Sequence, residues 1–199
     1  MQSLSNQQVL TPIEVLAQQG LLKEAITSYK ISRLADNKHD GEITFGGMDS
    51  SKFDPSTLIT IPNVSNIGFW EGTVDSVAVD GVDMGLQNRT AIFDTGTTGI
   101  LAPQGDAEAI HASIEGAQSD GQGGFTLPCT TNATISMTFG GRSFSIDPRD
   151  LADGPVDEND PTGDCISGIA ADTEALDSPS QWLVRSVSVD SWMTNSLCC

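Results

Sequence analysis

A single short segment holds residue types that could carry out chemistry. The apolar run at residues 91–93 leads into Asp94, and the threonines and glycines at residues 95–99 predict a tight turn. A carboxylate that must hold and activate a water molecule needs a rigid strand behind it, and an adjacent glycine lets water and a substrate backbone approach closely. Neighbouring hydroxyl groups can hydrogen-bond the carboxylate and fix its orientation. The candidate site is therefore Asp94 with Thr95, Gly96, Thr97 and Thr98.

The same Asp-Thr-Gly tripeptide also has a purely structural explanation. An aspartate at the end of a strand often hydrogen-bonds the backbone two residues further on and forms an Asx turn. Taken alone, the tripeptide favours that role for Asp94. A hydroxyl nucleophile at Thr97 or Thr98 is a weaker hypothesis, because no motif places a general base beside either residue.

Composition limits the classes of partner. The 199 residues are 38% apolar, which is enough for one substantial core. The 27 acidic residues against 9 basic ones give a formal charge of -18, which repels nucleic acids and anionic membranes, so neither is an expected partner. In strong acid most of this charge is neutralised, and the few basic residues limit positive charging, so acid tolerance is expected.

Most of the chain after Gly41 predicts short strands. Residues 42–45 form a β-prone run stopped by two glycines, and residues 77–79 alternate before Asp80-Gly81, a strong hairpin signal. A further strand is expected at 90–93, and a second hairpin at 135–146 turns at Gly140-Gly141. Between the hairpins, Ala107, Ile110 and Ile114 fall at helical spacing, with Gly116 as the expected cap.

Two other regions lie outside the strand-rich pattern. Thr11-Pro12-Ile13-Glu14 has the form of a helix start, and Gly20 is placed to end that helix. Residues 21–28 predict a second short helical or irregular stretch. Residues 147–161 are rich in aspartate and proline and predict an exposed loop, without the regular ligand spacing of a calcium loop.

The sequence around Asp94 closely resembles the second active-site motif of the pepsin-like aspartic endopeptidases, which reads three apolar residues and then Asp-Thr-Gly-Thr-Ser/Thr. Residues 43–49 (Ile-Thr-Phe-Gly-Gly-Met-Asp) resemble the family's central strand, and residues 69–77 resemble the Phe-Trp strand before the second lobe's hairpin. The likeness covers about residues 10–184 and is greatest to fungal secreted members. It implies that peptide bonds are hydrolysed in acid, without a cofactor, by a water that aspartate activates.

The resemblance also implies a fold and a disulfide. Cys129 and Cys165 lie where the family has its second-lobe disulfide, and a bridge closing about 37 residues would stabilise the fold by roughly 3 to 4 kcal/mol. The fold is expected to be mainly β, the pepsin-like acid protease fold. Residues 1–40 would be a helical remnant of the N-terminal lobe, 41–184 the C-terminal lobe and 185–199 a divergent tail.

Only one of the family's two aspartates has its motif here. The mechanism needs two carboxylates from two lobes, because one accepts the proton of the water while its protonated partner donates to the substrate carbonyl. Asp49 and Asp190 lack the following glycine and the strand context, and Tyr29 is not placed as the family's flap tyrosine. The first catalytic aspartate would then belong to an N-terminal lobe absent from these residues.

Three functional classes remain open. The chain could be the Asp94 half of an endopeptidase, with a protein or peptide substrate and the missing N-terminal lobe as partners. It could instead be a non-catalytic fragment that keeps part of a peptide-binding cleft at Gly96, Thr97 and Thr98. A homodimer that pairs two Asp94 residues ranks lowest, because the sequence from Arg185 departs from the Gly-Asp and strand residues that should complete the lobe. The resemblance implies a glycine at position 185, in a loop beneath the active-site turn, where the long cationic side chain of Arg185 would crowd the backbone.

The remaining signals concern location and packing. His39 and His111 follow no metal-ligand or triad spacing, so we expect solvated histidines, no metal site and no cofactor. Trp70 and Trp182 are the expected core tryptophans, ahead of Trp192.

The expected parent is a secreted glycoprotein, although no signal peptide or membrane-spanning run occurs in this chain. The glycosylation sequons, which are common by chance, begin at Asn63, Asn88 and Asn132. Without its partner lobe, the chain should expose apolar surface on the Thr11 helix and at residues 21–26.

Overall fold

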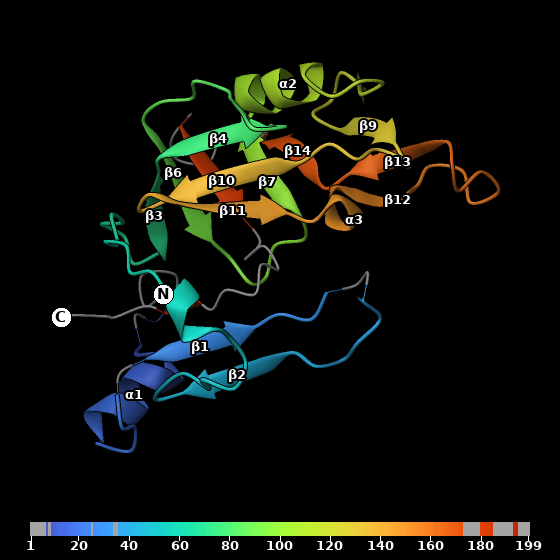
Figure 1. Cartoon of the computed structure of the whole chain (residues 1–199). Helices are drawn as coiled ribbons and strands as arrows, with labels where there is room; N and C mark the ends of the chain where they lie inside the picture. Colours follow the sequence, from blue (N-terminus) through green and yellow to red (C-terminus); the bar gives the residue numbers. More distant parts are fainter. Residues whose placement is uncertain are drawn as a thin grey trace.

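The molecule consists of a strand-rich lobe and a β-hairpin with a short helix that lies beside it (Figure 1). The computed structural model describes residues 7, 9–24, 26–33, 36–172, 180–184 and 193–194. The predicted mainly β fold is confirmed, and the strands within these ranges form four small sheets.

The N-terminal segment begins with the predicted capped helix. Helix α1 (Pro12–Gln18) follows Thr11, whose hydroxyl accepts a hydrogen bond from the Glu14 amide at 3.3 Å, while the Thr11 amide donates to Glu14 Oε2 at 2.6 Å. The expectation of a helical or irregular stretch at 21–28 is met in its irregular form at the described residues 21–24 and 26. It is wrong for Thr27 and Ser28, which begin strand β1 (Thr27–Lys30). Strand β1 pairs antiparallel with β2 (Glu42–Phe45) and with β16 (Met193–Thr194). The segment ahead of residue 41 is therefore part helix and part sheet.

Both predicted hairpins are confirmed, and they share one sheet with the strand order β11-β10-β4-β5. At the first turn, Asp80 and Gly81 both have positive φ (49° and 77°), as a tight two-residue hairpin requires. Strands β4 and β10 join the two hairpins, with Val77 opposite Met137. The strands are β4 (Ser76–Val79), β5 (Val82–Asp83), β10 (Ile135–Phe139) and β11 (Arg142–Ile146).

The sheet that carries the candidate site has the order β14-β7-β15-β6-β3, and helix α2 (Gln104–Ala112) follows directly from β7. The predicted helix is thus confirmed, and Gly116 lies beyond it with a positive φ of 81°. The strands of this sheet are β3 (Glu71–Val74), β6 (Arg89–Phe93), β7 (Ile100–Pro103), β14 (Ile169–Asp172) and β15 (Gln181–Val184).

The fourth sheet has the order β12-β13-β9-β8 and lies at the disulfide, which joins Cys129 to Cys165 as the resemblance implied. The prediction of a loop throughout residues 147–161 is wrong for its first half. Asp147 caps helix α3 by accepting from the Arg149 amide, and Leu151 is buried, so residues 148–155 are ordered by packing and pairing. The remaining elements are η3 (Pro55–Thr57), β8 (Gln118–Ser119), β9 (Phe125–Pro128), α3 (Pro148–Leu151), β12 (Ala152–Pro155) and β13 (Asp164–Ser167).

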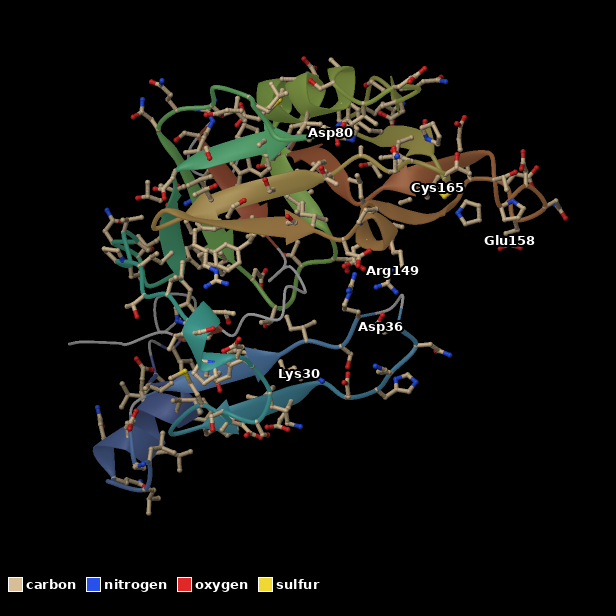
Figure 2. All side chains as sticks on the ribbon, in the orientation of Figure 1. Lys30, Asp36, Asp80, Arg149, Glu158 and Cys165 are labelled. Carbon is tan, nitrogen blue, oxygen red and sulfur yellow. A yellow bond between two sulfur atoms is a disulfide. The ribbon has the colours of Figure 1, made fainter. Side chains whose placement is uncertain are left out.

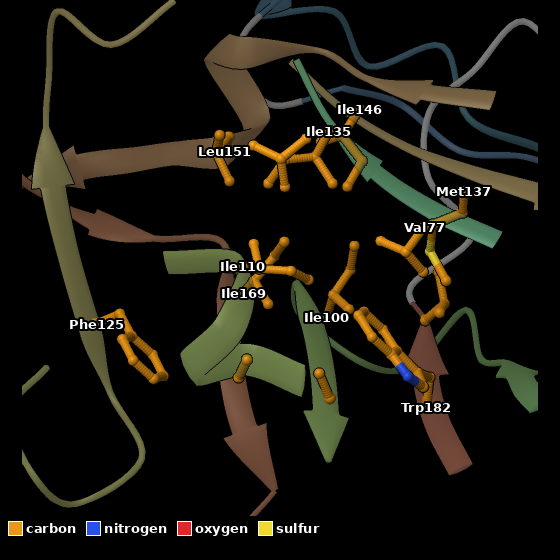
Figure 3. Packing of buried hydrophobic residues seen from close by; sticks show 14 of the residues in the cluster. Val77, Ile100, Ile110, Phe125, Ile135, Met137, Ile146, Leu151, Ile169 and Trp182 are labelled. Atoms are coloured by element: carbon orange, nitrogen blue, oxygen red, sulfur yellow. The ribbon is translucent and has the colours of Figure 1, made fainter. Parts of the chain in front are cut away.

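One apolar core lies between the sheets and α2 (Figure 3). Trp182, Ile110 and Leu127 are fully buried in it, which confirms the core position expected for Trp182. Trp70 is half-buried and packs against Tyr29, with ring centroids 5.4 Å apart. Trp192 lies outside the described residues.

Charged side chains tie the N-terminal segment to the lobe. Arg33 pairs with Asp147 at 2.7 Å and with Asp150 at 3.0 Å, and Arg149 pairs with Asp36 at 3.0 Å. Figure 2 shows Asp36 and Arg149 together between the hairpin and α3. Hydrogen bonds from Arg149 and Arg33 hold the pKa of Asp147 well below its usual value, so this carboxylate keeps its charge, and its pair with Arg33, in moderate acid.

The expectation of a solvated histidine is wrong for His111, although His39 is exposed. His111 stacks on Phe125 with 3.9 Å between ring centroids. Its Nδ1 lies 2.7 Å from the Ala107 carbonyl oxygen and its Nε2 lies 2.8 Å from Ser167 Oγ. Both ring nitrogens are therefore satisfied by a neutral imidazole, which donates to Ala107 and accepts from Ser167.

This burial predicts an acid-sensitive contribution to stability. Burial lowers the pKa of His111, so the unfolded chain takes up a proton more readily than the folded chain. The wild type should lose stability as the pH falls through about 6.5, the ordinary histidine value, and His111→Gln should lack that loss. The measurement is the free energy of unfolding of both proteins in urea at several pH values between about pH 7.5 and about pH 5.5. The excess stability of the wild type over His111→Gln should shrink as the pH falls through this range.

His39→Gln makes the same substitution at an exposed position and serves as the control. If the difference between wild type and His111→Gln were constant over this pH range, protonation of His111 would not be linked to unfolding.

Candidate functional site

Asp94 lies at the point where strand β6 ends and the turn to β7 begins. Strands β6 and β7 are not paired with each other; β15 lies between them, parallel to β6 and antiparallel to β7. The Asp94 amide donates to the Val184 carbonyl oxygen at 3.0 Å. The last residue of β15 thus holds the backbone of the candidate acid in place.

The carboxylate of Asp94 is oriented by two donors from its own turn. Oδ1 accepts the Gly96 amide at 2.8 Å, and Oδ2 accepts the Thr97 hydroxyl at 2.6 Å. The first of these bonds is the Asx turn that the structural explanation predicted, so the two explanations of the tripeptide are compatible. Because each carboxylate oxygen has a further lone pair and the residue is half-exposed, the group can still accept a hydrogen bond from water.

The other predicted site residues lie around this carboxylate on the exposed rim of the turn. Thr95 and Thr98 are exposed, and within the described ranges neither donates a side-chain hydrogen bond to Asp94. A Cβ atom at Gly96 would lie only 3.3 Å from Asp94 Oδ1. A side chain at Gly96 would therefore crowd the carboxylate, as expected for a position that a water or substrate must approach.

Two further glycines support the back of the turn. Gly99 belongs to the turn predicted at residues 95–99, but the sequence did not show what either glycine packs against. Gly99 has a φ of 78°, and a Cβ there would lie 2.7 Å from the Gly168 carbonyl oxygen, which accepts the Ile100 amide at 2.8 Å. Gly168 is confined in the same way by the backbone at Asp150, because a Cβ added at Gly168 would lie 2.3 Å from the Asp150 carbonyl oxygen. The available signal was the Cys165-Ile166-Ser167-Gly168 segment, whose glycine directly precedes strand β14.

The site has the features of a rigidly held general base. Asp94 can take a proton from a water, but the same step needs a second acid to protonate a substrate carbonyl. Across the part of the chain that the structure describes, no group of three or more His, Cys, Asp or Glu residues could hold a metal ion. Asp94 by itself can accept a proton, and the second acid would have to come from outside this turn. Arg185, which was expected to crowd the backbone beneath it, lies outside the described residues.

Comparison with known proteins identifies the class. The family profile described as eukaryotic aspartyl protease matches residues 1–184. The chain therefore belongs to this family. The match begins nine residues earlier than the sequence likeness suggested and ends at Val184, the last residue of β15.

Curated relatives in fungi agree with this assignment. The chain is 36% identical over 183 residues to a probable aspartic-type endopeptidase CTSD of Arthroderma benhamiae, covering 92% of this chain and 34% of the relative. It is 33% identical to the aspartic-type endopeptidase ctsD of Aspergillus fumigatus, covering 88% and 35%. It is 36% identical to rhizopuspepsin-1 of Rhizopus niveus, covering 82% and 40%. The chain thus spans between a third and a half of the length of these relatives.

The glycine packing behind the turn can be tested by substitution. Gly99→Ala should destabilise the lobe by about 1 to 3 kcal/mol, because alanine disfavours a positive φ and its Cβ would meet the Gly168 carbonyl. The free energy of unfolding in urea measures this loss.

Gly105→Ala is the matched control. Gly105 lies in α2, and no atom lies within 4 Å of its added Cβ. Alanine there should be neutral or stabilise by up to about 1 kcal/mol. Equal stability of the two variants would mean that the turn tolerates a shift away from Gly168.

Proposed function

We propose that Asp94 is one of the two catalytic carboxylates of an aspartic endopeptidase that hydrolyses internal peptide bonds of proteins in acid. The observation that carries this proposal is the half-exposed Asp94 carboxylate, held by the Gly96 amide and the Thr97 hydroxyl on a turn braced by β15. Membership of the eukaryotic aspartyl proteases supports the choice of reaction.

In the proposed mechanism, Asp94 and a second aspartate share one proton and hold one water between them. Two carboxylates this close do not both ionise readily, so one takes the proton of the attacking water while the other protonates the carbonyl oxygen of the scissile bond. The Gly96 amide and Thr97 hydroxyl keep Asp94 oriented through this transfer. The exposed Gly96, Thr95 and Thr98 form the rim that a peptide backbone would approach.

The second carboxylate is proposed to come from an N-terminal lobe, since the 199 residues hold one Asp-Thr-Gly and no Asp-Ser-Gly. An apolar surface suited to such a partner exists. Leu21, in the segment expected to expose apolar residues, is 65% exposed. The large apolar side chains of α1 are half-buried, so the exposed apolar surface expected on the Thr11 helix is not found there. Ile43 and Phe45 lie on one face of β2, and they are 55% and 52% exposed. We propose that the partner lobe covers these residues.

One alternative has an observation in its favour. The chain spans between a third and a half of its relatives' length and has a single active-site motif, so it could act alone as a catalytically inactive fragment that binds peptides at the Asp94 turn. The homodimer with two Asp94 residues is the remaining route to activity.

For location, we propose that the parent protein is secreted and glycosylated. All three sequon asparagines, Asn63, Asn88 and Asn132, are exposed, and the Asn63 side-chain amide donates to the Phe69 carbonyl at 2.9 Å. The disulfide fits an oxidising compartment. Of the helices that the structure describes, none has the length and apolar character to cross a membrane.

The test is a peptidase assay at acid pH on the longest protein that the gene encodes and on this chain alone. Asp94→Asn should reduce turnover by the longest protein by about 100-fold or more, because it removes a group that transfers protons in the reaction. Asp153→Asn makes the same change at an exposed site and should leave turnover intact. Full activity in Asp94→Asn would overturn the proposal.

Assays of this chain by itself distinguish the two-lobe enzyme, the homodimer and the peptide-binding fragment. No turnover at any concentration, with the Asp94-dependent activity confined to the longer protein, supports the two-lobe proposal. Turnover that rises with the square of the chain concentration and is blocked by pepstatin would instead support the homodimer. Binding of pepstatin without turnover, detected by calorimetry, would support the peptide-binding fragment.

A further inference from the structure

One buried carboxylate takes no part in the proposed reaction, but it is hydrogen-bonded to the two strands that hold Asp94, β6 and β15. Asp106, in the first turn of α2, is 3% exposed and is the only acidic side chain buried to this degree in the described part of the chain. A buried carboxylate is costly unless it is paired and hydrogen-bonded. Its partners therefore indicate what it stabilises.

Asp106 accepts three hydrogen bonds from two other elements. Arg89, the first residue of β6, donates from Nε to Oδ2 at 2.6 Å and from Nη2 to Oδ1 at 2.8 Å. Trp182, in β15, donates from its indole Nε1 to Oδ2 at 3.0 Å. The bidentate pair neutralises the buried charge, and the indole bond adds a neutral donor. Asp106 thus joins α2, β6 and β15.

Strand β15 leads directly from this junction to Asp94. Trp182 lies opposite Ala91 of β6 in the parallel register, and Val184, two residues further on, accepts the Asp94 amide. The Trp182 side chain is fully buried, and Figure 3 shows it beside Ile100 at one end of the core. The indole has one donor, so its bond to Asp106 fixes how the side chain sits in the core.

We propose that Asp106 is a positioning residue for Asp94. It holds Trp182, and through Trp182 it keeps β15 inserted between β6 and β7, with the Val184 carbonyl under the Asp94 amide. Arg89 supplies the counter-charge that compensates this buried carboxylate. The proposal gives Asp106 a role at the proposed catalytic aspartate, but its test needs no activity and can fail while the proposed function stands.

The test compares local and global opening by amide hydrogen exchange in the full 199-residue chain. Asp106→Asn keeps the shape of the side chain but places an amide against the donors of Arg89. Trp182→Phe removes the indole donor and leaves the Arg89 pair intact. Each variant should reduce protection of the Asp94 amide by about 10- to 100-fold more than protection of the Met137 amide, which lies in the central strand β10 of the hairpin sheet.

Ile110→Val is the matched control, because Ile110 is a fully buried residue of the same helix. It should lower protection at Asp94 and Met137 by one common factor, since it weakens packing alone. In the double variant of Asp106 and Trp182, the loss at Asp94 should be close to that of Asp106→Asn alone, because both changes break the same link.

Two results would overturn the proposal. If Asp106→Asn lowered protection at Asp94 and Met137 by the same factor, the buried carboxylate would stabilise the fold without positioning the site. If the two single losses multiplied in the double variant, Asp106 would not act through Trp182. Should Asp106→Asn fail to fold, Trp182→Phe decides alone: an equal loss at both amides refutes the proposal, and a loss concentrated at Asp94 supports it.

Discussion

The hydrogen bond from the Asp94 amide to the Val184 carbonyl is the interaction on which the arrangement of the site depends. Strands β6 and β7 flank the turn but do not pair, so the turn has no hairpin of its own to hold it. Strand β15 fills the space between them and comes from a distant part of the sequence. The geometry of the carboxylate is thus local, whereas its position is set by non-local pairing, which forms late and slowly in folding.

The hairpin β1–β2 is held to the lobe by a different kind of interaction. Tyr29 packs on Trp70, and Arg33 and Arg149 pair with aspartates on both sides of the contact. Such partly exposed pairs contribute little singly, but a connected network fixes orientation more firmly than isolated pairs do. The lowered pKa of Asp147 keeps this carboxylate charged, and paired with Arg33, in the acid where the proposed reaction would take place.

The sequence predicted the elements whose signals are local. The capping box at Thr11, the Asp80-Gly81 turn and the alternating strands at 77–79 and 135–146 depend on neighbouring residues, and each is present. The disulfide came from the family resemblance. The Asp94 turn was found because its glycine and threonines are adjacent in sequence, and two of them hydrogen-bond the carboxylate.

The errors arose where distant contacts override local character. His111 gave no sign of burial, since its partners Phe125 and Ser167 come from other strands. The Asp- and Pro-rich start of the 147–161 segment looked like a loop, but Leu151 enters the core and orders it. Asp106 was not considered because its pairing with Arg89 and Trp182 exists only in the folded sheet.

The close backbone layers behind the turn also limit how this lobe can vary in evolution. Gly99 faces the Gly168 carbonyl, and Gly168 faces the Asp150 carbonyl, so each of the two glycines is confined by main-chain atoms. A clash between side chains can be relieved by a smaller neighbour, but no substitution shortens a peptide group. The two positions therefore have no compensating partners, and a lineage that lost either glycine would have to move the backbone that carries Asp94.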